Sequence, residues 1–172
     1  MCEFGDSSQI TEEKVVLANE NLIGYRGWYM SNSFNAEEKH LRSLYVDFLW
    51  KKDEESTGTP LRDNSMGIYL YNSYYNYSYY NYSDNYYNYN YSSIYYVAGQ
   101  ASVAGKTFIY RDGYRTSLSK PLELVILSNK KWFENTKTVK FAEHFNNTVV
   151  KVAEEYGCKT IGYNEFTNGE YD

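Results

Sequence analysis

The chain contains one stretch close to a phosphate-binding loop, Gly99–Thr107. Such a loop needs a glycine, four further residues and then Gly-Lys-Ser/Thr, between a strand and a helix. Here Gln100 stands where the first glycine belongs, and the strand-like run Phe108-Ile109-Tyr110 follows where the helix should begin. Without a helix N-terminus, the phosphates would lack their main N–H donors. We therefore interpret this stretch as a glycine-containing turn between two strands.

Other side chains that could do acid–base, nucleophilic or metal chemistry are few. They are His40, His144, Cys2, Cys158 and the pairs Glu37-Glu38 and Glu154-Glu155. Both histidines are expected on solvated helix surfaces, and no Ser or Cys pairs with a histidine as nucleophile and base. Adjacent helical residues do not face each other, so neither glutamate pair forms a dyad. Cys158 is expected to pack as a small hydrophobic residue. The sequence predicts no enzyme, no cofactor and no metal site.

The most unusual part of the chain is a Tyr-rich segment, residues 71–96. Its 26 positions hold 13 Tyr, 6 Asn and 5 Ser, with Asp84 and Ile94. A five-residue unit repeats within it, as Tyr74-Tyr75-Asn76-Tyr77-Ser78 and again as Tyr79-Tyr80-Asn81-Tyr82-Ser83. Tyr favours strands, and Asp84-Asn85 suits a two-residue turn. We predict a long hairpin in which paired residue numbers sum to 169; a coiled loop and a disordered tract are the alternatives.

A surface of Tyr, Ser and Asn is typical of protein-binding sites, because Tyr gives large, stiff contact area while Ser and Asn adapt their hydrogen bonds. The sequence therefore favours a non-enzymatic protein that binds a protein partner. The predicted contact residues are Tyr77, Tyr79, Tyr80, Tyr82, Tyr86, Tyr87, Tyr89, Asn81 and Asn88. Pairing of hairpin edges between two copies, which is self-association, is a variant of this hypothesis. A small acidic chain with a repeat of AT-rich codon types would suit a phage- or mobile-element-encoded inhibitor of a host protein.

The alternative function is binding of single-stranded nucleic acid, in which bases stack on Tyr while cations follow the phosphates. Four basic residues form an island after the Tyr-rich segment and could contact an anion: Lys106, Arg111, Arg115 and Lys120. Arg111 and Arg115 flank a predicted hairpin tip, where solvated cations are common. The net charge of −5 counts against nucleic acid.

Length and composition bound the protein further. A chain of 172 residues is expected to form a single domain, 1–172. Two cysteines make no disulfide framework. No stretch reads as a signal peptide or a membrane span, so a cytoplasmic protein without membrane contact is expected.

The remaining patterns predict an α+β fold, with an antiparallel sheet and two to three packed helices. Helices are expected over Ile10–Ile23 (with a strand as the alternative), after Asn35 and over Val139–Tyr156, where Gly157 ends the last one. Expected strands are Gly24–Met30, Gly67–Leu70, Val97–Ala98, Thr107–Tyr110, Tyr114–Leu118, Leu122–Leu127 and Cys158–Tyr163.

Overall fold

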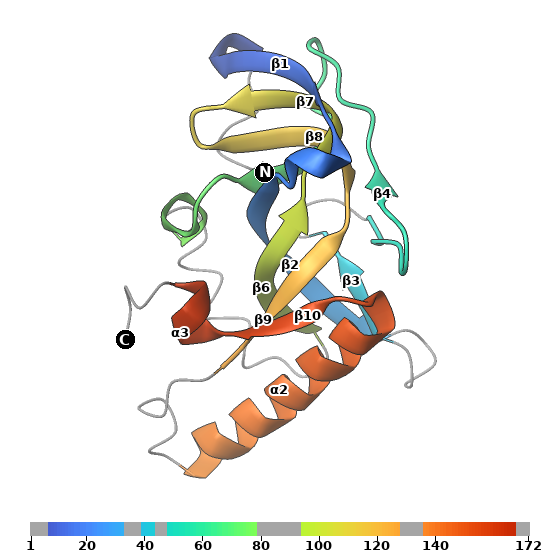
Figure 1. The fold of residues 1–172 in the computed structure, drawn as a ribbon. Coiled ribbons are helices and arrows are strands. Elements are labelled where there is room, and N and C mark those ends of the chain that lie inside the picture. Colours follow the sequence, from blue (N-terminus) through green and yellow to red (C-terminus); the bar gives the residue numbers. More distant parts are fainter. Residues whose placement is uncertain (1–6, 33–38, 44–47, 79–93, 128–135, 168–172) are drawn as a thin grey trace.

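A computed structural model describes residues 7–32, 39–43, 48–78, 94–127 and 136–167 (Figure 1). Within these residues the strands form one mixed sheet in the order β1-β7-β8-β5-β2-β6-β9-β10, while β3 pairs with β2 and β4 with β8. The strands are β1 Ile10–Val16, β2 Ile23–Asn32, β3 Lys39–Arg42, β4 Ser56–Thr57, β5 Ile68–Tyr71, β6 Ile94–Ser102, β7 Ala104–Tyr110, β8 Gly113–Ser119, β9 Pro121–Ile126 and β10 Lys159–Gly162. All pairs are antiparallel except β9–β10.

The helices lie on the two faces of this sheet. Helix α2, Thr136–Tyr156, packs against β9, β10 and β3, as Figure 1 shows. A short helix α3, Tyr163–Phe166, and a helical turn over residues 74–78 lie on the opposite face. Two 3-10 turns, Ser7–Gln9 and Ala18–Glu20, flank β1. The expected α+β class is therefore confirmed, with a mixed rather than wholly antiparallel sheet.

The two faces have different chemistry, because alternate strand residues point to opposite sides. We call the side under α2 the helix face; its strand residues include Trp28, Met30, Leu70, Val97 and Leu124. We call the other side the tyrosine face; its strand residues include Tyr25, Tyr29, Tyr71, Tyr96 and Tyr110. A sheet covered on both sides has two cores, one mainly aliphatic and one rich in phenol rings.

Several predicted elements are confirmed. Strands β7 and β8 form the hairpin expected around Asp112-Gly113. Strands β2, β9 and β10 match their predicted positions, and α2 ends before Gly157, whose positive φ of 66° suits a helix stop. The stretch Gly99–Thr107 runs from β6 into β7 with no helix, as expected for a link between two strands.

Two predicted helices are wrong in the described residues. Residues from Ile10 form strand β1, the alternative reading, because their β-branched side chains pair with β7. The helix expected after Asn35 is replaced by β3, which pairs with the end of β2, and Arg42 then bridges to Leu49. The ten-residue β2 extends past β5, so its backbone groups need another partner there, and β3 supplies it.

The predicted Tyr hairpin is also corrected. Tyr71 was expected to pair with Ala98, but it lies opposite Tyr25 and Gly113, while Ala98 lies opposite Gly27. Strands β5 and β6 are separated by β2, and residues 74–78 are helical. The expected turn at Asp84-Asn85 lies outside the described residues.

Candidate partner-binding surface

The Tyr-rich segment leaves the sheet through a capped helical turn. Strand β5 ends at Tyr71, and Ser73 then accepts a hydrogen bond at Oγ from the Asn76 backbone N–H, 3.1 Å away. The Tyr77 N–H donates to the Ser73 carbonyl at 3.1 Å. A serine that accepts from a backbone N–H three residues later is the usual N-cap of a helix. This cap stabilises a helical turn where Tyr content alone favours a strand.

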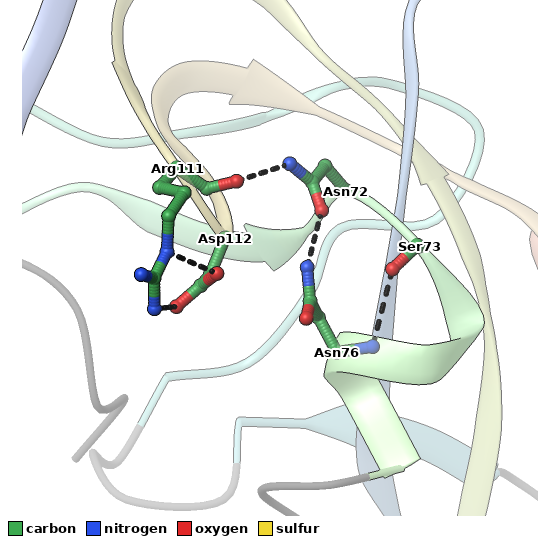
Figure 2. Close-up of polar contacts among 5 residues, drawn as sticks. All are labelled: Asn72, Ser73, Asn76, Arg111 and Asp112. Carbon is green, nitrogen blue, oxygen red and sulfur yellow. Dashed lines mark hydrogen bonds and ion pairs between the residues drawn. The ribbon is translucent and has the colours of Figure 1, made fainter.

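A polar network ties this turn to the β7–β8 hairpin (Figure 2). Because β5 pairs with β8 as far as Tyr71 and Gly113, Asn72 lies beside the hairpin turn. The Asn72 backbone N–H donates to the Asp112 carbonyl (3.0 Å), and its Nδ2 donates to the Arg111 carbonyl (2.8 Å). Its Oδ1 accepts from Asn76 Nδ2 at 2.8 Å. One asparagine thus holds the β7–β8 turn and the helical turn together.

Two tyrosines of the turn are buried on the tyrosine face. Tyr74 and Tyr77 lie three residues apart, so they share one side of the helical turn. The ring of Tyr74 lies 5.2 Å from that of Phe166, and its hydroxyl lies 3.3 Å from the Tyr163 hydroxyl. The ring of Tyr77 lies 6.4 Å from Phe166. Tyr75 points the other way and is 63% exposed, so the turn presents one phenol outward on a packed base.

A buried contact joins the two ends of the Tyr-rich segment. The hydroxyls of Tyr77 and Tyr96 are hydrogen-bonded to each other in the core. Tyr96 can reach this point because its side chain lies over Gly27 of the neighbouring strand, where a Cβ would come within 2.7 Å of Tyr96 Cε2 and closer still to the hydroxyl. A glycine is required here by close approach of a side chain. We call the Tyr77–Tyr96 contact above Gly27 the neck.

The structure corrects one predicted contact residue and leaves the others untested. Tyr77 was expected at the surface, but it is 1% exposed, because the helical turn directs it into the core. The other eight predicted contact residues lie outside the described part of the chain: Tyr79, Tyr80, Tyr82, Tyr86, Tyr87, Tyr89, Asn81 and Asn88.

The structure separates the four residues of the predicted basic island from one another. Arg115 is 0% exposed and bonds to protein groups in the core. Lys106 is exposed near the start of β7, with Nζ 5.5 Å from the Phe108 ring centre, and Lys120 follows β8 at the same end. Arg111 lies about 16 Å along β7 from Lys106, at roughly 3.3 Å per residue. Only Arg111 adjoins the helical turn, and Asp112 pairs with its guanidinium at 3.2 Å.

The surface also includes residues that were not predicted, namely Tyr75, Asn72 and Asn76. The signal for them was Ser73 three positions before Asn76, a capping pattern within the repeat. A helical start makes Tyr75 the outward residue and buries its neighbours at 74 and 77. Strand alternation alone does not distinguish these positions, because the repeat carries Tyr at adjacent positions.

Outside this surface, two potentially reactive side chains of the described residues, Cys158 and Tyr156, have raised pKa values because they are buried. Burial raises the pKa of the Cys158 thiol to about 11, and Cys158 packs against the core, as expected of a small hydrophobic residue. Burial also raises the pKa of Tyr156 to about 12; its hydroxyl donates to the Trp50 carbonyl and accepts from the Leu41 N–H, each at 2.9 Å. His144 is exposed on α2, and His40 is half-buried in β3.

The described residues contain no cluster of three or more His, Cys, Asp or Glu side chains able to hold a metal ion. In the same residues, no helix combines the length and apolar character needed to cross a membrane. Comparison of the chain with known families, characterised proteins and solved structures finds no match.

Proposed function

We propose that this protein binds a protein partner through the Tyr/Asn/Ser-rich surface that begins at Tyr75, without catalysing a reaction. The observation that carries the proposal is the neck. Both ends of the Tyr-rich segment are fixed in a buried aromatic cluster, so the segment starts and finishes on a rigid base. A binding surface loses less conformational entropy on association when its base is already fixed.

The composition of the segment supports the same function. Tyr75 is exposed beside the Asn72–Asn76 amide pair, which combines a large phenol with adaptable hydrogen-bonding groups. Burial of Tyr74 and Tyr77 beside the exposed Tyr75 supports a division of the tyrosines between support and partner contact. We further propose that the protein acts in the cytoplasm as an inhibitor of a host protein, encoded by a phage or mobile element.

The test uses a display variant, in which five tyrosines are replaced by Ser: Tyr75, Tyr80, Tyr82, Tyr87 and Tyr89. Tyr77 is retained because it supports the neck. A control variant carries Val15→Ser and Leu17→Ser, two exposed apolar residues at β1. Proteins captured from the native host are identified and purified. Each is then titrated by calorimetry against the wild type, the display variant and the control variant. Wild type and control should bind one such partner equally, and the display variant at least tenfold more weakly.

Equal affinity of the display variant, with its thermal unfolding unchanged, would overturn the proposal. Self-association is tested on the wild-type chain by light scattering: a concentration-dependent dimer that the display variant loses would identify a second copy as the partner. Nucleic acid is tested by titrating labelled single-stranded DNA and RNA at low salt, where the phosphate contribution is largest. This alternative is less well supported, because Lys106 and Lys120 lie at the end of β7 and β8 away from the turn that contacts Asn72.

A further inference from the structure

Arg115 is an arginine held in the core by neutral groups. It lies on the tyrosine face of β8, between Phe108 of β7 and Tyr69 of β5. Its Nε donates to the Tyr110 hydroxyl at 3.0 Å, and Cζ lies 4.6 Å from the centre of the Phe108 ring. The residue is completely excluded from solvent.

The other contacts of Arg115 hold the segment between β4 and β5. Nη1 donates to the carbonyls of Leu61 and Met66, at 3.0 and 2.9 Å, and to Asn64 Oδ1 at 3.1 Å. This segment therefore covers the guanidinium. Three acceptors share the two N–H bonds of Nη1, so both donors of this nitrogen are satisfied.

Nη2 is in a different situation. It is buried, and none of the described residues accepts a hydrogen bond from it. None of the described carboxylates lies within ion-pair distance of Arg115 either. An arginine does not lose its proton in proteins, so its positive charge has no counter-ion among the described residues, and the two N–H donors of Nη2 have no acceptor there. Buried charges are normally paired, because removing them from water is costly.

We propose that Nη2 binds a small monovalent inorganic anion, of the size of a halide or nitrate, beneath residues 58–67. Such an ion satisfies both requirements at once, since it accepts the N–H bonds and neutralises the charge. Complete burial of Arg115 restricts the ligand to a small free ion, because a phosphate or carboxylate attached to a macromolecule could not be enclosed. A water molecule would accept the hydrogen bonds but leave the charge uncompensated. The site is independent of the proposed partner binding.

The first experiment measures thermal unfolding of the whole chain at constant ionic strength, with sodium gluconate replaced stepwise by chloride, bromide or nitrate. Gluconate is too large for an enclosed site. When the small anion reaches about ten times its Kd, Tm should rise by about 3–6 °C for a chain of this size. The matched variants are Arg115→Gln and Arg111→Gln. Arg111 lies on the same hairpin with an exposed side chain, so its variant should keep the rise, while Arg115→Gln should lose it.

A wild-type Tm that is the same in gluconate and in the small anions would overturn the proposal. Loss of the rise in Arg111→Gln but not in Arg115→Gln would also overturn it, since the anion would then bind at the surface. If Arg115→Gln fails to fold, crystals of the wild type grown in bromide give the answer by anomalous scattering. A bromide peak in contact with Nη2 supports the site, and a water molecule there without anomalous signal refutes it.

Discussion

Replacing Gly27 by alanine tests the neck directly. The new methyl group would overlap the ring and hydroxyl of Tyr96, with its Cβ 2.7 Å from Tyr96 Cε2. Ordinary contacts of a Cβ are 3.4–4 Å, so the phenol must move by most of an ångström or more. Tyr96 is packed on all sides and hydrogen-bonded to Tyr77, so the displacement weakens the contact that joins the two ends of the Tyr-rich segment.

The expected loss of stability follows from three contributions. Inserting a methyl group into a packed core costs about 1–3 kcal/mol. Weakening the buried hydrogen bond between the hydroxyls of Tyr77 and Tyr96 adds about 1 kcal/mol. Replacing glycine restricts the unfolded chain and returns about 0.4–1 kcal/mol. The free energy of unfolding should therefore fall by about 1–3.6 kcal/mol, which for a chain of this size lowers Tm by about 2–14 °C.

The assay is a double-mutant cycle by urea unfolding, with Gly27→Ala, Tyr96→Leu and the double variant. Leucine lacks the outer ring atoms and hydroxyl, so it leaves room for the methyl group. The cost of Gly27→Ala should drop by at least 1 kcal/mol in the Tyr96→Leu background, since contacting residues couple on this scale. Equal cost in both backgrounds would refute the steric explanation, and a stabilised Gly27→Ala would refute the described approach of Tyr96 to β2.

Three other predictions follow. Tyr77→Phe removes one buried hydroxyl of the neck and should lower the free energy of unfolding by about 1 kcal/mol, measured by urea unfolding; no change would mean that the hydroxyl contact is unimportant. Ser73→Ala removes the cap and should speed hydrogen exchange at the Asn76 amide about fivefold, as expected for a loss of about 1 kcal/mol, whereas Ser65→Ala should not. The contribution of Cys158 and Tyr156 to the free energy of unfolding should be complete below pH 9 and should be lost as the pH rises toward 12. Burial raises the pKa of Cys158 from 9.0 to about 11 and of Tyr156 from 10.0 to about 12, so the unfolded chain loses these protons first. Urea midpoints at pH 8 and 10.5 measure this effect, and a midpoint that rises with pH would contradict it.

The elements that the sequence predicted well are those with local signals. Asp112-Gly113 lies between two runs of strand-forming residues, and the resulting hairpin needs no distant information. Helix α2 was predicted because its apolar spacing is helical and Gly157 can adopt the positive φ that ends it. Its packing is also simple, since Val149 and Val152 turn one stripe toward the helix face.

The elements that were missed depend on distant partners. Strand β3 opens a stretch in which Leu41, Leu44, Tyr45, Phe48 and Leu49 have the sequence spacing of a helix. Its residues nevertheless pair with the end of β2. Strand β5 was predicted as a strand, but its expected pairing with the residues around Ala98 is wrong, because no feature of its own residues specifies β2 and β8 as its neighbours. The Tyr-rich segment also has tyrosines on every side, so its pattern cannot tell which ones are buried. Tyr77 is buried because Gly27, fifty residues earlier, leaves space for Tyr96.

The neck has a consequence for how the repeat can change during evolution. Tyr77 in the first repeat unit and Tyr96 at the end of the segment meet in the core, so the packed domain is joined at both ends of residues 79–93. The entropy of loop closure grows only with the logarithm of length. Adding one five-residue unit to residues 79–93 would cost about 0.3 kcal/mol by that relation. By this relation, duplication or loss of a unit would change the Tyr and Asn content of the segment at almost constant stability, so the proposed binding surface could vary between lineages without prior stabilisation of the fold.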